Sequence, residues 1–227
     1  MNVIETINLQ KHYQIGDNSV LAVDGIDLNV KEGEFVCISG RSGSGKSTLL
    51  SLLAGLESPT GGEVRLLGQH LEEMNEQERG RFRRAHIGFI FQAYNLLSQF
   101  NAWENVAVPL EIRGIPLQER KEKAMEALEM VGLTDHAEHR PTEMSGGQQQ
   151  RISIARAIIT RPDIVFADEP TGNLDTRTGT EIMSLLTDLF RRWGTTFLVV
   201  SHDEDMHRYT DREIRLKDGK IEKVIVQ

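Results

Sequence analysis

A glycine-rich loop offers the clearest chemistry in the sequence. Residues 40–48 read GRSGSGKST and fill the pattern G-x-x-x-x-G-K-[ST], between an apolar run and a helix-forming run. Glycines let successive backbone N–H groups approach phosphate oxygens, and the N-terminus of the following helix adds positive potential. Lys46 should reach the β- and γ-phosphates, and the Ser47 hydroxyl is placed to ligate Mg²⁺. A Gly/Ser-rich surface loop is the alternative, but the spacing and flanking runs favour nucleotide contacts from Gly40, Arg41, Ser42, Gly43, Ser44, Gly45, Lys46, Ser47 and Thr48.

Two adjacent carboxylates end a second apolar run. Residues 164–167 are apolar and lead into Asp168, Glu169 and Pro170. In open α/β sheets, ligands gather at such carboxyl ends of strands. Asp168 suits the Mg²⁺ ion and its waters, and Glu169 would orient the attacking water or accept its proton. Alone, the pair would more often be a solvated turn; with the phosphate loop upstream, it predicts hydrolysis of a nucleotide.

Alternating strand and helix patterns would position these groups. The first third contains the strand-like runs NVIETINL, AVDGIDLNV and EVRLLG, which predict a small sheet, and EFVCIS, which predicts a core strand before the phosphate loop. Residues 94–160 are predicted to be mainly helical. The last third predicts strand DIVFAD, a helix over 176–193, strand TTFLVVS and a closing strand pair around Asp218-Gly219. Strands alternating with helices indicate an α/β fold with a mostly parallel sheet.

Composition limits the classes of function. The chain has 227 residues and a net charge of −8, so its overall charge does not attract nucleic acid or anionic lipid. The N-terminus lacks a charged leader followed by an apolar core, and no apolar run approaches the roughly 18 residues that span a bilayer. We therefore expect a cytoplasmic location. The one cysteine, Cys37, cannot form an internal disulfide and is expected to be buried in a strand.

A third segment carries a specific resemblance. The run MSGGQQQRISIARAI, from Met144 onward, strongly resembles the signature segment of ABC ATPases, although that family commonly has leucine where Met144 stands. Met144 is an apolar replacement of similar volume, which we expect to be tolerated. The segment itself predicts a helix start: Ser145 can cap, the two following glycines expose N–H groups, and Ile152, Ala155 and Ile159 share a helical face. Such a helix end attracts phosphate.

Further motifs of the ABC ATPase family occur in the expected order. Gln92 resembles the Q-loop glutamine, residues 172–175 (GNLD) the D-loop, His202 the switch histidine and Tyr13 the A-loop aromatic. Singly, each could be an ordinary packing or surface residue; together, their order and spacing support the resemblance.

The resemblance implies a head-to-tail dimer that holds two ATP molecules between the phosphate loop of one copy and the signature segment of the other. Tyr13 would stack on adenine, Gln92 would sense Mg²⁺ and the attacking water and link to a membrane partner, and His202 would contact the γ-phosphate. Asp175 would communicate across the dimer. The opposing nucleotide would be contacted by the signature residues Ser145, Gly146, Gly147 and Gln148.

The implied architecture is a single ABC ATPase domain over residues 1–227: a P-loop core with an N-terminal antiparallel β subdomain and an inserted helical subdomain. Residues 1–92 would hold the β subdomain and first part of the core, 93–160 the helical subdomain, and 161–227 the rest of the core. The chain would be an ATPase that drives a separate integral-membrane permease at the cytoplasmic face of the inner membrane. Its motifs look most like the lipoprotein-releasing and macrolide-exporting group, which includes the cell-division ATPase FtsE.

Three other classes of function compete with this interpretation. ABC proteins that act on ribosomes or DNA typically carry two cassettes or long coiled coils, whereas this chain has one cassette and no sustained heptads. P-loop GTPases and small-molecule kinases do not need SGGQ, and the sequence has no N-K-x-D segment. A regulatory subunit that binds ATP without hydrolysis is disfavoured by Glu169. We expect no nucleic-acid partner.

Overall fold

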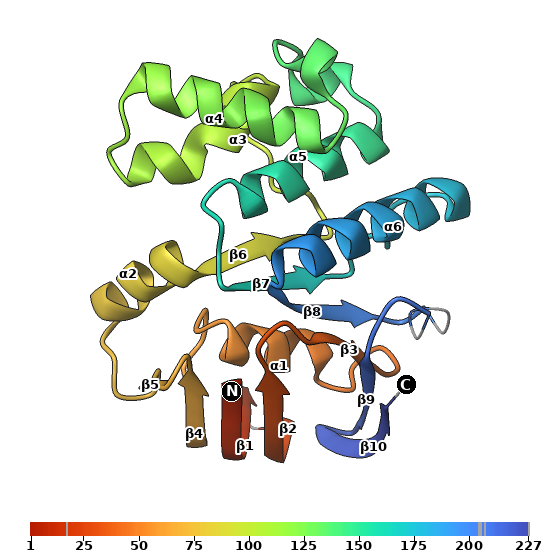
Figure 1. Ribbon diagram of the computed structural model, residues 1–227. Coiled ribbons are helices and arrows are strands. Elements are labelled where there is room, and N and C mark those ends of the chain that lie inside the picture. The colour runs from red at the N-terminus through yellow and green to blue at the C-terminus, as the bar shows by residue number, and fades with distance from the viewer. Residues whose placement is uncertain (17, 204–205, 207, 227) are drawn as a thin grey trace. The chain divides into compact units, whose positions relative to one another are not determined.

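The computed structural model describes residues 1–16, 18–203, 206 and 208–226 (Figure 1). The chain forms two compact units. The first unit comprises Met1–Arg83 and Gly194–Gln227, and the second comprises Arg84–Trp193. The division into residues 1–92, 93–160 and 161–227 made from the sequence stays a prediction.

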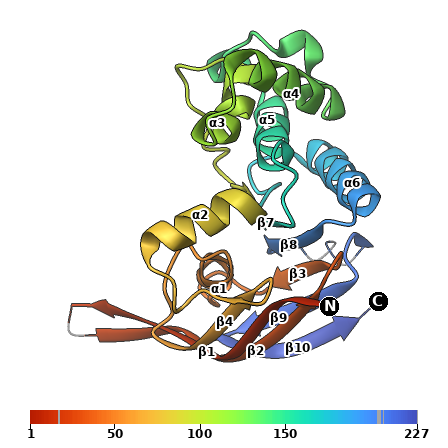
Figure 2. The same ribbon diagram turned by 60° about the vertical axis from the view of Figure 1, so that its left-hand side comes forward.

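An antiparallel sheet occupies the first part of the first unit, in the strand order β2-β1-β4-β5. Its strands are β1 (Asn2–Ile15), β2 (Asn18–Lys31), β4 (Gly61–Leu66) and β5 (Gln69–His70). Strands β1 and β2 form a long hairpin, which Figure 2 shows as an extended ribbon. Apolar side chains such as Ile4, Val23 and Val64 are buried on this sheet, because alternate residues of a strand share one face. The small sheet predicted for this region is confirmed.

Mostly parallel strands form the other part of the first unit. They are β3 (Phe35–Ser39), β8 (Thr196–Ser201), β9 (Arg212–Lys217) and β10 (Lys220–Val226), in the order β10-β9-β3-β8. Strand β3 is parallel to both β8 and β9, whereas β9 and β10 form the predicted closing pair. Every residue of β8 is buried, as expected for a strand covered on both faces. Helix α1 (Lys46–Leu53) follows β3 through the glycine-rich loop.

Helices dominate the second unit, where strands β6 (Ile87–Ile90) and β7 (Ile164–Asp168) pair in parallel. The helices are α3 (Ala102–Ile112), α4 (Leu117–Met130), α5 (Gly146–Ile158) and α6 (Thr176–Trp193), with short 3-10 turns at Thr134–His136 and Pro141–Glu143. Helix α2 (Glu76–His86) runs through the point where the chain passes from one unit to the other. Helices α3, α4 and α5 pack on one another (Figures 1 and 2).

The helical region begins later than the sequence indicated. Residues 94–101 are not helical, so the prediction was wrong for this segment. Tyr94 and Asn95 have left-handed φ values of 60° and 50°, which a right-handed helix excludes. Asn101 then caps α3 through a capping box with Glu104. The fully buried Asn105 side chain holds the irregular segment by accepting from Leu97 N and donating to three backbone carbonyls.

Two further expectations concern Cys37 and membrane-spanning segments. Cys37 lies in β3 with no exposed surface, and burial raises the pKa of its thiol to about 12, so it packs as a small hydrophobe as predicted. Among the described residues, no helix combines the length and apolar character that crossing a membrane requires.

Candidate active site

The loop between β3 and α1 is shaped by glycines in conformations that other residues avoid. Gly40, Gly43 and Gly45 have φ values of 148°, 79° and 96°. A Cβ atom built on Gly45 would lie 2.1 Å from the carbonyl oxygen of Ala22, and one built on Gly40 would lie 2.5 Å from that of Leu216. Both contacts are closer than real Cβ atoms allow. The loop can therefore keep this close course only with glycine at these positions.

The polar groups of this loop fit a bound phosphate chain. Helix α1 starts at Lys46 with Gly45 as its N-cap, and among the described residues no side chain caps it or places a carboxylate in its first turn. Its first N–H groups and positive dipole end are therefore suited to an external anion. Lys46 is buried and donates to the Arg41 carbonyl oxygen at 3.0 Å. The Ser44 hydroxyl is buried without a hydrogen-bond partner within the described residues, which leaves it able to bond a ligand oxygen.

His202 and the phosphate loop lie at the same edge of the sheet. Ser39, the last residue of β3, pairs in parallel with Ser201, the last residue of β8. Gly40 and His202 therefore follow neighbouring strands at their carboxyl ends. His202 is exposed, and the Ser201 hydroxyl accepts a hydrogen bond from the Asp203 N–H at 3.0 Å. The first unit thus brings the switch-like histidine to the edge where the phosphate loop begins.

Tyr13 lies in the β1–β2 hairpin and is held by a charged pair. Its hydroxyl donates to Glu57 at 2.6 Å, and Glu57 also pairs with Lys11 at 3.1 Å. Burial, together with the nearby Glu57 carboxylate, raises the pKa of Tyr13. The Lys11 ammonium lies 5.1 Å from the centre of the ring, so a stacking base would use the opposite ring face.

The carboxylate pair and Gln92 come together in the second unit. Ile90 of β6 pairs with Ala167 of β7, so Gln92 and Glu169 each follow the paired positions by two residues. A Cβ atom built on Gly172 would lie 2.9 Å from the Gln92 Nε2 atom and 3.2 Å from the Glu169 Oε2 atom. The structure therefore gathers the amide and carboxylate around one glycine, next to Asp168 at the end of β7.

Glu169 itself has an unusual backbone conformation. Its φ is +44°, although it is not glycine and precedes a proline. A residue held in a sparsely populated conformation persists only when its surroundings impose it, and such residues concentrate at functional sites. The Glu169 carbonyl oxygen accepts the Gly172 N–H at 3.0 Å, which closes the turn.

The signature-like segment forms the predicted helix start. Ser145 is the N-cap of α5, and its Oγ atom accepts the Gln148 N–H at 3.3 Å while Gln148 Oε1 accepts the Ser145 N–H at 2.9 Å. Ser145 is exposed, so its hydroxyl proton can be donated to an outside acceptor. Met144 is buried, as an apolar residue there should be.

Asp175 caps the next helix. Its carboxylate accepts the Thr178 N–H at 3.0 Å and the Thr178 hydroxyl at 2.6 Å. The hydrogen bond from the Thr178 side chain lowers the pKa of Asp175. Within this chain Asp175 therefore orders the start of α6, and its communication across a dimer stays a prediction.

A group of three possible metal ligands, on β4, on β5 and just after β5, is engaged in bonds with its neighbours. Glu63, His70 and Glu72 offer ligand atoms within 4.8 Å of one another. However, Glu63 pairs with Arg65 at 2.7 Å, and Glu72 accepts from His70 at 2.7 Å and from the Val64 N–H at 3.0 Å. These bonds brace the hairpin, so the cluster is an ion-pair network.

Comparison with known proteins decides the family. A sequence model described as "ABC transporter" matches residues 23–172. The chain belongs to the ABC transporter family.

Its ABC relatives include two curated proteins. The chain is 47% identical over 219 residues to the macrolide export ATP-binding/permease protein MacB of Chlorobaculum tepidum, a match that covers 96% of this chain and 33% of MacB. It is 46% identical over 213 residues to the lipoprotein-releasing system ATP-binding protein LolD of Chromohalobacter salexigens, covering 94% of this chain and 90% of LolD. The chain therefore corresponds to only part of MacB and to most of LolD.

A solved ABC cassette has the same fold. The dimeric structure of the ATP-binding cassette MJ0796, in a post-hydrolysis state bound to ADP and Pi, matches with a TM-score of 0.92 and 42% sequence identity over 98% of each chain. The predicted ABC ATPase fold is confirmed. The prediction that the chain is an ATP-binding and ATP-hydrolysing ABC subunit is also confirmed.

Two further residues, Asn173 and Arg156, make hydrogen bonds that the sequence did not indicate. The Asn173 side chain donates to the Gln92 carbonyl oxygen at 2.9 Å. Arg156 of α5 donates to the carbonyl oxygens of Tyr94 and Asn95 at 2.7 and 2.6 Å, and burial lowers its pKa to about 10. These bonds fix the segment after Gln92. The sequence alone could not indicate these hydrogen bonds, because each joins residues that are far apart in the chain.

Substituting Gly172 by alanine tests whether turnover requires Gln92 and Glu169 to lie together around this glycine. The added methyl group would displace both side chains, and misplacing a reacting group by about 1 Å can cost about a hundredfold in rate. We expect ATP turnover, measured as phosphate release, to fall by about tenfold or more with the melting temperature little changed.

Gly179→Ala in α6 is the matched control, because a Cβ there meets only ordinary contacts at 3.5 Å and beyond. It should keep native turnover. Equal turnover of the Gly172→Ala variant and the native protein would contradict the arrangement.

Proposed function

We propose that this ABC ATPase binds ATP with Mg²⁺, closes as a head-to-tail homodimer and drives a separate integral-membrane permease. It acts on the cytoplasmic face of the inner membrane, in a system of the lipoprotein-release or macrolide-export type that transmits mechanical work. The observation that carries the proposal is that Ser145 is exposed at the start of α5. This helix end attracts phosphate and is present in addition to the complete phosphate loop. The relatives MacB and LolD support the transport class.

The oxygen atoms of three predicted ligands would suit Mg²⁺. The Ser47 hydroxyl follows Lys46 in the first turn of α1, and the Asp168 carboxylate ends β7. Mg²⁺ is a hard cation that prefers oxygen ligands, and Gln92 would contribute an amide oxygen. When bound, the ion would neutralise charge on the β- and γ-phosphate oxygens.

The chain's own residues would perform the chemistry. Lys46 and the α1 N-terminus bind the phosphates, and Tyr13 stacks on the adenine. Glu169 orients a water molecule for attack on the γ-phosphorus and takes up its proton, as the bond from that phosphorus to the bridging oxygen breaks and ADP leaves. Gln92 helps to orient that water. His202 contacts the γ-phosphate and stabilises the charge that develops there.

A second copy would complete each site. Ser145 can donate its hydroxyl proton, and Gly147 lies in the first turn of α5, where N–H groups lack helix partners. Both would contact the γ-phosphate bound to the partner's loop. The MJ0796 cassette is dimeric in its ADP- and Pi-bound state, which supports a dimer for this chain.

Replacing Glu169 by glutamine should trap the dimer. The amide cannot take up a proton, and loss of positioned proton transfer typically costs about a hundredfold or more in rate. We expect steady-state ATP turnover to collapse and light scattering with ATP and Mg²⁺ to report a dimer. Glu129→Gln, an exposed change on α4, is the control for altered charge. A Glu169→Gln chain that stays monomeric and hydrolyses ATP normally would contradict the proposal.

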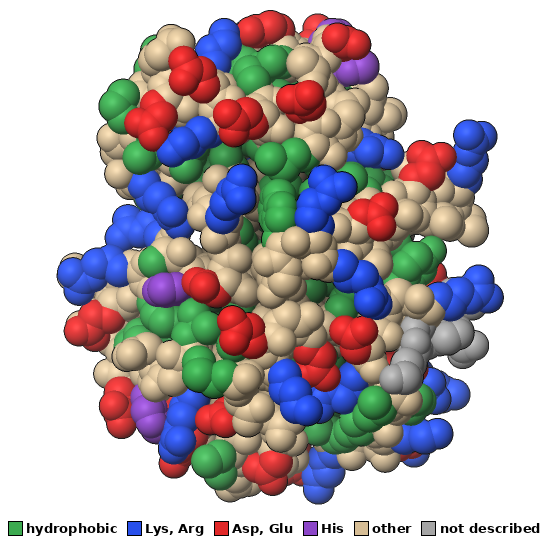
Figure 3. Space-filling model, viewed as in Figure 1, with side chains coloured by type: hydrophobic (Ala, Val, Ile, Leu, Met, Phe, Trp, Pro, Cys, Tyr) green, Lys and Arg blue, Asp and Glu red, His purple; other side chains and the backbone are tan. Residues whose placement is uncertain are grey.

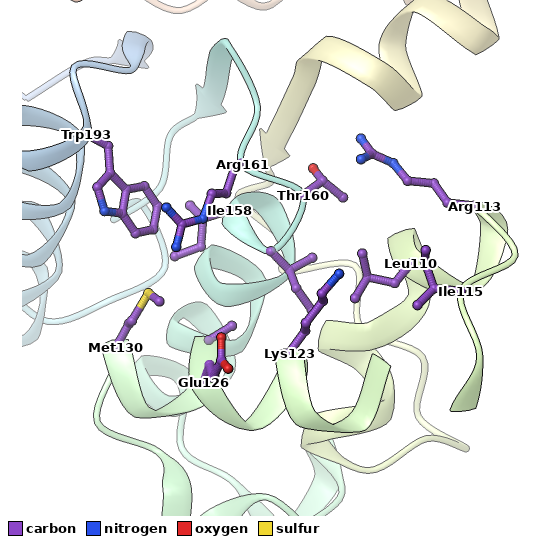
Figure 4. Close-up of a pocket in the computed structure, with 12 residues that line it drawn as sticks. Leu110, Arg113, Ile115, Lys123, Glu126, Met130, Ile158, Thr160, Arg161 and Trp193 are labelled. Carbon is purple, nitrogen blue, oxygen red and sulfur yellow. The ribbon is translucent and has the colours of Figure 1, made fainter. Parts of the chain in front are cut away.

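A groove in the second unit suits the permease. It has a volume of about 380 Å³ and is lined by α3, α4 and the ends of α5 and α6 (Figure 4). Leu110, Met130 and Trp193 supply apolar surface, and the positive charges of Arg113, Lys123 and Arg161 outnumber the carboxylate of Glu126. On the face in Figure 3, the surface over α3 and α4 carries charges of both signs among hydrophobic side chains.

The groove's occupant would be a short amphipathic cytoplasmic helix of the permease with acidic side chains. Its apolar face would cover Met130, and its carboxylates would approach Lys123, which is 44% exposed although it pairs with Glu119. Nearby Ile112 and Leu117 are 57% and 59% exposed, so the apolar surface extends beyond the groove.

A photo-crosslinking residue at Met130 tests this contact in cells. We expect it to capture a cytoplasmic segment of an integral-membrane protein, and Lys123→Glu to weaken that capture by like-charge repulsion. The same probe at Glu122, an exposed position on α4 outside the groove, is the control. Equal capture at both positions, or capture of ribosomal proteins alone, would count against the groove as the permease site.

A further inference from the structure

A buried glutamine links the signature helix to the catalytic turn. Gln150 lies in α5 with no exposed surface, and its Nε2 atom donates to the carbonyl oxygen of Pro170 at 2.6 Å. Its Oε1 atom is buried without a hydrogen-bond partner within the described residues. A buried amide oxygen without a hydrogen-bond partner is unfavourable, so the Gln150 side chain occupies this position at a cost in stability.

Pro170 needs this bond. The residue is buried, so its carbonyl oxygen must find a hydrogen-bond donor away from water. Gln150 supplies that donor from a different element, 20 residues earlier in the chain. The hydrogen bond therefore fixes the turn directly after Glu169 to the second turn of α5.

The bond acts next to a strained residue. Glu169 keeps a φ of +44° immediately before Pro170, and this conformation needs support from both sides. The Gly172 N–H to Glu169 oxygen bond supports the turn from within, and Gln150 supports it from α5. Loss of the Gln150 amide would let the turn relax and move the Glu169 carboxylate.

We propose that Gln150 is a positioning residue that makes the orientation of Glu169 follow the position of the signature helix. The inference rests on the proposed function, in which Ser145 at the start of α5 contacts the nucleotide held by the partner copy. Movement of α5 on that nucleotide is then passed by Gln150 to the Glu169 carboxylate that acts on the chain's own nucleotide. The two ATP sites of the dimer are coupled in this way.

Gln150→Met tests the link, because methionine has a similar length but cannot donate to Pro170. We expect the kcat for ATP to fall about tenfold to a hundredfold, since a buried carbonyl loses its donor beside the catalytic group. KM for ATP of Gln150→Met should match that of the native protein. ATP-dependent dimerisation of a Glu169→Gln/Gln150→Met double variant should match that of Glu169→Gln alone. The Hill coefficient for ATP turnover should be lower for Gln150→Met than for the native protein.

Gln149→Met is the matched control. The Gln149 amide donates to the Met144 carbonyl oxygen at 3.1 Å, within its own segment, and does not reach the catalytic turn. Its kcat should stay close to the native value. A Gln150→Met enzyme with native kcat, or an equal loss in both variants, would overturn the inference.

Gln150→Glu gives a further readout, the pH dependence of kcat, which would not change if Gln150 had a purely structural role. A buried carboxyl favours its neutral form, which can donate an O–H to Pro170, whereas the ionised form cannot. The ratio of its kcat to native kcat should therefore rise as the pH falls. A ratio that does not change with pH in the folded variant would contradict the role of the donor.

The same assays separate this inference from the proposed function. The proposed function would be refuted if the native protein did not hydrolyse ATP and the Glu169→Gln variant did not dimerise with ATP. Native hydrolysis with an unaffected Gln150→Met variant would refute only the positioning role.

Discussion

Backbone N–H groups can surround a phosphate only where no side chain stands between the chain and its ligand. At the start of α1, packing within the protein also excludes every residue except glycine, since a Cβ on Gly45 would lie 2.1 Å from the Ala22 carbonyl oxygen. The uncapped start of α1 and the buried Lys46 then supply the positive potential. The buried apolar residues of β3 (35–38) and the fully buried strand β8 hold this loop in place, because neither strand can shift without exposing apolar side chains.

The proposed role of Glu169 in hydrolysis depends on a second constraint, the course of the chain after β7. Glu169 occupies a conformation that an isolated peptide would seldom adopt. Polar bonds from distant residues hold it and its neighbours: Gln150 reaches Pro170, Asn173 reaches Gln92, and Arg156 reaches the segment beyond Gln92. These donors converge on backbone carbonyls, so the turn at Glu169 and the segment after Gln92 are tied to α5.

Features with a fixed local spacing could be predicted from the sequence. The phosphate loop, the Ser145 cap and the closing turn at Asp218-Gly219 each depend on a few consecutive residues, and each has its predicted structure. The non-helical course of residues 94–101 was missed because left-handed Tyr94 and Asn95 are stabilised from α5, far along the chain. The roles of Gln150 and Asn173 were missed for the same reason: tertiary hydrogen bonds leave no local pattern.

We infer that the signature segment of a second copy completes each ATP site. Mixing a Lys46→Ala chain with a Ser145→Arg chain tests it most directly, because only the mixed dimer contains one site with both an intact phosphate loop and an intact signature segment. Each variant alone should be inactive, and ATP hydrolysis should appear on mixing in proportion to the mixed dimer measured by native mass spectrometry. Mixed dimers without activity, or a Ser145→Arg chain that hydrolyses ATP at the native rate, would contradict the account.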